Sequence, residues 1–170
     1  MNTTVVITDT DSSLPPGLAA KYQIDQVPIL INFDNQSFTT GVDIDDKLLF
    51  EKVDQYKKLP TTSAPSPSAF QSAYAKAFQS GADSIITICV SSKISSTYES
   101  AVSAREAFSG RDITVLDSLS VSMAQGFLAL TAAEVLAQGA TKQEAIEQVN
   151  QINQRIVLYA VLPTQTFDSK

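Results

Sequence analysis

The side chains best placed to bind a ligand are the hydroxyl groups of Ser91–Thr97, in the segment SSKISST. This segment follows SIITICV at 84–90, an apolar, β-branched run that predicts a strand buried on both faces. A helical pattern then begins at Ile94 and continues through Tyr98 to Val102. A strand that passes through serines into a helix offers backbone N–H groups and the positive helix end, which favour an anion. The sequence therefore predicts that Ser91–Thr97 is one wall of an anion-binding site.

Polar residues also follow the other predicted strands. Residues 8–10 (TDT) follow the first strand, and Asp117 and Ser118 follow the fourth. The loop 61–63 (TTS) leads into a helix that must return to the central strand. Because the carboxyl ends of parallel strands meet at one edge, we expect these groups to form a single site for a carboxylate, sulfate or phosphate. The alternative is that these serines and threonines only cap helices and turns.

Composition narrows the class of protein. The chain has 170 residues, enough for one domain, and 44% hydrophobic and 18% charged residues are typical of a globular protein. A net charge of −6 disfavours nucleic acid as a partner. No apolar run reaches the length of a membrane span, and the start of the chain lacks the pattern of a signal peptide. With a single cysteine, we expect a cytoplasmic protein.

The absence of histidine from the sequence excludes a Ser-His-Asp or Cys-His nucleophile and the usual zinc sites. Cys89 lies inside the predicted central strand, where a free cysteine behaves as a small hydrophobic residue. We therefore expect no catalytic residue, no metal and no cofactor.

The predicted elements alternate between strand and helix. Asp45, Ser66 with Pro67, and the T-x-x-E pair Thr141 and Glu144 each predict a helix start. The predicted strands are 4–7, 27–33, 37–40, 84–90, 113–116 and 157–162, and the predicted helices are 17–22, one from Asp45, one ending at Gly81, one after Ser91–Thr97, 122–138 and one from Thr141, with an irregular loop at 57–67. This order predicts a three-layer α/β domain with a mainly parallel sheet of four to five strands flanked by helices.

Four segments carry a resemblance to a known family. They are ITDTDSSLP (7–15), LPTTSAPSPSAF (59–70), ICVSSKISSTYESA (88–101) and VLDSLSVSMAQGFL (115–128), and GVDID (41–45) and RIVLYAVL (155–162) also fit. Together they resemble the DegV family of bacterial fatty-acid-binding proteins over nearly the whole chain.

The resemblance implies that the chain holds one long-chain fatty acid. In the family the carboxylate is bound by the second Thr of the TTS motif and the second Ser of the SSK motif, which match Thr62 and Ser92. Ser63, Ser95 and Ser118 are implied as supporting donors. Relatives present the bound acid to a separate fatty acid kinase, so the resemblance implies a carrier and not an enzyme.

The sequence departs from the family pattern in several places. Ala64 stands where the family usually has Gln, Ser96 where it has Gly, and Ser13 where it has Asp. The resemblance also implies that residues 1–162 are the family's N-terminal lipid-binding domain, that 163–170 are a tail, and that the family's second domain is absent from this sequence.

Two other functions remain open from the sequence. Asp9-Thr10-Asp11 after the first strand is similar to the DxD motif of haloacid-dehalogenase-type phosphotransferases. In that case Asp9 would be the nucleophile beside Mg²⁺, and Lys93 and Asp117 would have to complete the site. The other alternative is a structural fragment that binds no lipid.

Overall fold

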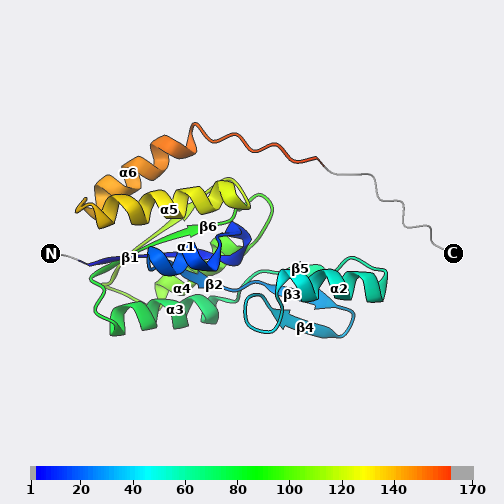
Figure 1. The fold of residues 1–170 in the computed structure, drawn as a ribbon. Helices are drawn as coiled ribbons and strands as arrows, with labels where there is room; N and C mark the ends of the chain where they lie inside the picture. The colour runs from blue at the N-terminus through cyan, green and yellow to red at the C-terminus, as the bar shows by residue number, and fades with distance from the viewer. Residues whose placement is uncertain (1–2, 162–170) are drawn as a thin grey trace.

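A computed structural model describes residues 3–161 of the chain, which form two sheets with helices around them (Figure 1). The strands are β1 (Thr4–Asp9), β2 (Asp25–Val27), β3 (Leu30–Phe33), β4 (Gln36–Thr39), β5 (Thr61–Ser63), β6 (Ser84–Cys89) and β7 (Asp112–Asp117). The helices are the 3-10 turn η1 (Thr10–Ser12), α1 (Pro16–Lys21), α2 (Asp46–Tyr56), α3 (Pro67–Gln79), α4 (Thr97–Glu106), α5 (Met123–Ala137) and α6 (Lys142–Asn153).

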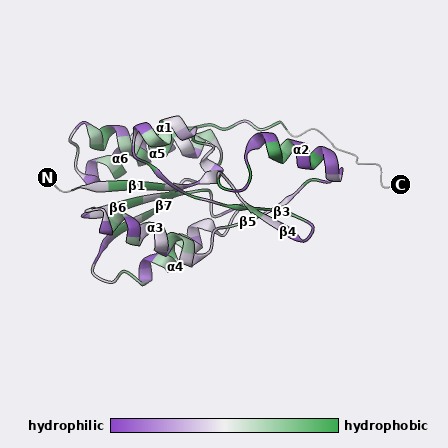
Figure 2. Ribbon diagram, turned by 60° about the horizontal axis from the view of Figure 1, so that its bottom comes forward, coloured by the Kyte–Doolittle hydropathy of each residue, from purple (hydrophilic) through white to green (hydrophobic). Residues whose placement is uncertain are grey.

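The main sheet has four parallel strands in the order β2-β1-β6-β7. Helices α1, α5 and α6 cover one face and α3 and α4 cover the other, as both ribbon views show (Figures 1 and 2). This arrangement confirms the predicted three-layer α/β fold with a parallel sheet. Parallel strands need helical crossovers, and those crossovers bury both faces of the sheet.

The apolar run SIITIC forms the central strand β6. All residues of this strand are buried, which accounts for their apolar composition. Its side chains alternate between the two faces, as the pleat of a strand requires. Ile86 and Ile88 pack in the core on the α5 side, whereas Ile85 and Cys89 pack on the α3 side. Cys89 is fully buried, as expected of a small hydrophobic residue.

The helix starts follow the predicted caps. The side chains of Asp45 and Ser66 accept hydrogen bonds from backbone N–H groups in the first turns of α2 and α3. Thr141 and Glu144 form the predicted capping box at the start of α6. These caps satisfy N–H groups that have no partner within their helix, which is why local sequence alone locates them.

The predicted strand 27–33 is wrong, because two strands in different sheets replace it. β2 ends at Val27 and lies at the edge of the main sheet, and β3 begins at Leu30 in a small antiparallel sheet of order β4-β3-β5. Pro28 lies between them and has no N–H group to continue a ladder. The chain therefore leaves the main sheet at this proline.

The loop predicted at 57–67 is also only partly irregular, because it contains β5. This strand pairs antiparallel with β3, and α2 packs against the small sheet through a separate apolar cluster around Ile31 and Phe33. The pairing joins Ile31 to Thr62, which are far apart in the sequence. Since the partner strand is not local, the three-residue segment itself gives no signal of it.

The helix after the serine segment begins later than predicted. α4 starts at Thr97, and the side chain of Ile94 is 65% exposed instead of lying on the buried face. The N–H groups of Ile94 and Ser95 both donate to the carbonyl of Ser91, so the chain makes a turn before the helix. Ala101 and Ala104 are buried on the inner face of α4.

The strand predicted at 157–162 is absent from its described part. Residues 157–161 form no strand, and Leu162 and the predicted tail 163–170 lie outside the described residues. After α6 the chain runs away from the sheet (Figure 1), and Val157, Leu158 and Tyr159 are exposed. A β-branched, apolar composition favours a strand only where a sheet edge is available for pairing.

Helix α5 is apolar on nearly all sides because it packs between the sheet and α6. No helix within residues 3–161 combines the length and the apolarity that crossing a membrane demands. At its first turns α5 also approaches the turn after β1. A Cβ atom on Gly126 would lie 2.7 Å from the backbone oxygen of Ser12, so only glycine fits at this contact.

We predict that Gly126→Ala lowers the free energy of unfolding by about 1–3 kcal/mol, because the added methyl group collides with backbone that cannot move freely. Urea denaturation measures the change. Gly17→Ala on α1 is the matched control, because nothing lies within 4 Å of its Cβ position. The control should be neutral or stabilising by up to about 1 kcal/mol, and an equal loss in both variants would contradict the proposed contact.

Candidate functional site

The carboxyl ends of β1, β6 and β7 lie in register at one edge of the main sheet. Thr8 is opposite Ile88, and Cys89 is opposite Asp117. The polar segments that follow these strands are therefore neighbours. Two carboxylates join them, since Asp9 accepts a hydrogen bond from the N–H of Val90 and Asp117 accepts from Ser92. The predicted gathering of the segments after β1, β6 and β7 is confirmed.

Ser92 is bound to Asp117 through both its side chain and its backbone. The Ser92 hydroxyl donates to Asp117 Oδ2 at 2.6 Å, and its N–H donates to Oδ1 at 3.2 Å. Asp117 Oδ1 also accepts from the N–H of Leu119 at 2.9 Å. The carboxylate therefore fixes the start of the serine segment against the end of β7.

The backbone N–H groups of this segment are less free than the sequence predicts. The N–H of Ser91 donates to the carbonyl of Ser120, and that of Lys93 donates to Ser91 Oγ. Ile94 and Ser95 donate to the carbonyl of Ser91. The expected free N–H groups are therefore not at Ser91–Ser95, whose N–H groups donate to Ser120, to Asp117 and within the turn at Ser91. At the start of α4 the N–H groups of Ser96, Tyr98 and Glu99 have no hydrogen-bond partner among the described residues.

Ser95 and Ser118 lie at the same edge, and both hydroxyl groups have hydrogen-bond partners within their own loops. Ser95 Oγ is 2.8 Å from Thr97 Oγ1 and accepts from the N–H of Thr97. Ser118 is 1% exposed, and its hydroxyl donates to the carbonyl of Ser120 and accepts from its N–H. In this structure both residues shape the loops around Ser92.

Thr62 and Ser63 belong to β5 of the small sheet, which lies beyond the carboxyl ends of the main strands (Figure 1). Neighbouring side chains of a strand point to opposite faces. Thr62 pairs with Ile31, whereas Ser63 accepts a hydrogen bond from Asn32 on the other face. Both are exposed, and within residues 3–161 no hydrogen bond joins either to Ser92, Ser95 or Ser118. Only one of the two hydroxyls can face a given ligand.

The small sheet is connected to the main sheet through Thr10. Its hydroxyl oxygen accepts from the N–H of Ile29 at 2.9 Å and lies 2.7 Å from Thr40 Oγ1. The Thr40 hydroxyl donates to the carbonyl of Ile29 at 3.0 Å, so Thr10 is the donor to Thr40. This three-residue cluster, the Thr10 cluster, joins the start of β3 and the end of β4 to the turn after β1. Because β5 pairs with β3, the cluster connects the strand that carries Thr62 to the main sheet.

Asp9 is buried inside the protein, where hydrogen bonds occupy its carboxylate. It is fully buried, and its carboxylate accepts from the N–H groups of Asp11 and Val90 and from the side-chain amide of Gln125. Burial raises the pKa of Asp9 from 3.8 to about 6, with the nearby charge of Asp11 adding to the rise and the hydrogen bonds from Val90, Gln125 and Asp11 opposing it. Burial also raises the pKa of Asp11. Gln125 donates to Thr8 as well, so this network joins α5 to the sheet.

This environment weighs against Asp9 as a phosphotransferase nucleophile. A nucleophile must reach its substrate, but both oxygens of Asp9 are occupied and the residue has no exposed surface. Within residues 3–161 no group of three or more acidic, histidine or cysteine side chains is arranged to hold a metal ion. The DxD resemblance is explained by the turn that Asp9 caps at η1.

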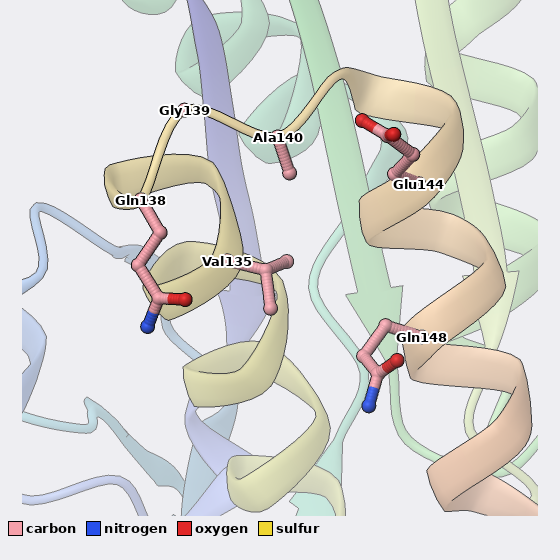
Figure 3. Close-up of a pocket in the computed structure, with 6 residues that line it drawn as sticks. All are labelled: Val135, Gln138, Gly139, Ala140, Glu144 and Gln148. Carbon is pink, nitrogen blue, oxygen red and sulfur yellow. The ribbon is translucent and has the colours of Figure 1, made fainter.

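A hollow of about 440 Å³ lies at the corner between α5 and α6 (Figure 3). Val135, Gln138 and Gln148 line it, and Glu144 is already used in the capping box at the start of α6. Hydrogen bonds from the N–H and hydroxyl of Thr141 lower the pKa of Glu144. The hollow is remote from the serine segment and has no part in the candidate site.

A family model described as "uncharacterised protein, DegV family" matches residues 3–167. The chain belongs to the DegV family. A DegV domain-containing protein of Caldanaerobacter subterraneus is 37% identical over 156 residues, which are 92% of this chain and 55% of the relative. The resemblance predicted from the four sequence segments is therefore confirmed.

Solved DegV structures share the fold described above. A Thermus thermophilus DegV protein described as binding fatty acid has 30% identity and a TM-score of 0.81, over 89% of this chain and 54% of its own. DegV of Bacillus subtilis, described as a fatty acid binding protein, has 29% identity and a TM-score of 0.82, over 91% of this chain and 55% of its own. The chain thus spans about half the length of these relatives.

Sequence reasoning did not assign three residues that organise this edge. Asp117 was identified at the edge but was not recognised as the partner of Ser92, and neither Thr10 nor Gln125 was identified as a connecting residue. A signal for Asp117 does exist, because a carboxylate at the end of a parallel strand next to a serine turn has donors within reach. Thr10 and Gln125 act through contacts distant in the sequence, and no local pattern marks them.

The raised pKa of Asp9 predicts a pH dependence of stability. Because the folded protein holds this proton more tightly than the unfolded chain, the contribution of Asp9 to stability falls as the pH rises from about 4 to about 6. The expected fall is about 3 kcal/mol, at about 1.4 kcal/mol per pKa unit. Urea denaturation of the native chain and of Asp9→Asn across this range measures it as a difference between two profiles. Parallel profiles would contradict the assignment.

The Thr10 cluster predicts that Thr10→Val loosens the small sheet while keeping the shape of the side chain. Loss of the hydroxyl leaves the N–H of Ile29 without its acceptor and should lower the free energy of unfolding by about 1–3 kcal/mol. Amide hydrogen exchange in β3 and β5 should speed up more than in β6. Thr39→Val on β4 is the control, and equal effects of the two variants would count against a connecting role for Thr10.

Proposed function

We propose that this chain binds a long-chain fatty acid, with the head group at the carboxyl edge of the main sheet and in contact with Ser92 and Thr62. The observation that carries the proposal is the position of the two matching segments. TTS lies on β5 of the small sheet, SSK follows β6 of the main sheet, and the small sheet lies past the ends of the main strands (Figure 1). Two relatives with this fold are described as fatty-acid-binding proteins.

The edge also offers apolar surface for an acyl chain. Ile94 and Leu119 are exposed at 65% and 60%, and they line a hollow of about 540 Å³ next to Ser91. Ile156 and Leu158, from the segment after α6, form its other side. Burial of a methylene group yields about 0.8 kcal/mol, so the acyl chain supplies most of the affinity and the hydroxyl contacts orient the head group.

The site favours binding over catalysis. Ser92 has a carboxylate partner but no general base of the histidine type, because the sequence has no histidine. Asp9 is buried and occupied. We therefore propose that the protein is a carrier, that it is not itself an enzyme, and that a separate fatty acid kinase acts on the bound acid.

The test is binding of palmitate to the delipidated full chain, measured by native mass spectrometry and titration. We expect one palmitate per chain, and we expect Thr62→Val combined with Ser92→Ala to weaken binding at least tenfold, because both head-group contacts are removed. Circular dichroism should show an unchanged fold.

Thr61→Val is the matched control, because Thr61 precedes Thr62 on β5 and its side chain points to the opposite face. Palmitate binding that survives the double substitution would show that the head group lies elsewhere. A native chain that takes up no palmitate would instead support the structural alternative.

A further inference from the structure

The hydroxyl of Ser92 has only one hydrogen to donate, and it donates that hydrogen to Asp117, with Ser92 Oγ 2.6 Å from Asp117 Oδ2. We propose that the site takes its ligand as a neutral carboxylic acid, whose O–H donates to Ser92 Oγ while Ser92 donates to Asp117. A carboxylate that binds from neutral solution must then take up one proton. This inference rests on the proposed fatty-acid site and concerns the protonation state of its ligand.

Asp117 is committed as an acceptor. It receives the hydroxyl and the N–H of Ser92 and the N–H of Leu119, so three donors surround its two oxygens. If Ser92 turned its hydrogen toward an ionised ligand, Asp117 would lose its shortest hydrogen bond. Two negative groups would then face each other across a single oxygen atom. The lone pairs of Ser92 Oγ remain available, and they need a donor from the ligand.

The N–H groups that directly follow Ser92 in the chain are already used as donors. The N–H groups of Lys93, Ile94 and Ser95 are used within the turn. The hydroxyl of Ser118 donates to the carbonyl of Ser120. At Ser92 itself an ionised head group meets lone pairs, whereas a neutral acid donates its O–H to Ser92 Oγ and its carbonyl oxygen stays free to accept a hydrogen bond from the exposed hydroxyl of Thr62.

Acidic side chains outnumber basic ones near Ser92. Asp9 and Asp11 from the β1 turn, Glu99 from α4 and Asp117 from β7 are acidic, and Lys93 is the neighbouring cation in the serine segment. Burial raises the pKa of the Cys89 thiol, and the negative charges of Asp9, Asp117 and Glu99 raise it further. The field at the end of β6 is therefore negative and opposes a second carboxylate.

The proton balance is simple. A free carboxylic acid loses its proton with a pKa of about 4–5, so at pH 7 the ligand is ionised in solution. On binding, one proton moves from the solvent to the head group and no covalent bond changes. Between pH 6 and pH 8 the affinity should therefore fall about tenfold for each pH unit.

The test is calorimetric titration of the full chain with dodecanoate at pH 7 in buffers that differ in ionisation enthalpy. We expect uptake of close to one proton per bound ligand. 1-Dodecanol, which can donate a hydrogen bond without ionising, should bind with an affinity independent of pH. Methyl dodecanoate, which has no donor, should bind more weakly than the alcohol.

Asp117→Asn separates this arrangement from a structural role. The amide oxygen can accept from the N–H groups of Ser92 and Leu119, and the amide nitrogen can donate to Ser92 Oγ. The Ser92 hydrogen is then free for a carboxylate, so proton uptake should fall toward zero and the pH profile should flatten. Glu99→Gln removes a nearby charge without touching Ser92 and should keep the uptake.

Two results would contradict the proposed protonation of the ligand. Dodecanoate binding without proton uptake, and lost in Lys93→Gln, would show a carboxylate held by Lys93, so that this inference is wrong while the proposed function stands. No binding of either dodecanoate or 1-dodecanol would overturn both. If Asp117→Asn does not fold, the buffer dependence and pH profile of the native chain alone confirm or overturn the inference.

Discussion

The carboxyl edge of the main sheet depends on two aspartates that receive hydrogen bonds from the loop after the central strand. Asp9 accepts from the N–H of Val90, and Asp117 accepts from the N–H and hydroxyl of Ser92. Parallel strands bring their ends together but leave the loops beyond them without ladder partners. A carboxylate at a strand end supplies those partners, and in doing so it fixes the path of Ser91–Thr97.

This arrangement has a consequence for the kind of ligand that fits. Hydroxyl groups are both donors and acceptors, so a serine-rich loop has no fixed preference for an anion. Here Asp117 accepts the Ser92 hydrogen, the carbonyl of Ser120 accepts the Ser118 hydrogen, and the turn at Ser91 uses the N–H groups of Ile94 and Ser95. The loop therefore presents lone pairs at the place where a fatty acid head group is proposed to bind. A hydroxyl-rich segment and an anion site are not equivalent, and the partners of the hydroxyls decide which one is present.

The proposed site is also divided between two sheets that are connected by few contacts. Thr62 is carried by a three-residue strand, and the Thr10 cluster positions that strand's sheet against β1. Only Pro28 and Ile29 separate β2 from β3, so the small sheet starts directly from the edge of the main one. Such a connection places two hydroxyl-bearing segments, distant in the sequence, on either side of the same edge.

Features that depend on neighbouring residues or on burial can be predicted from the amino-acid sequence. The apolar run of β6 predicts a strand covered on both faces, and Ser66 and the Thr141–Glu144 pair predict helix starts, because caps and periodicity are local. Long-range contacts in the folded chain explain why the chain changes sheets at Pro28, why 61–63 pairs as a strand and why 157–161 does not. The hydrogen bond from the Ser92 hydroxyl to Asp117 is a contact of the same long-range kind. Strand pairing and hydrogen-bond direction depend on partners distant in the sequence, and no local pattern specifies them.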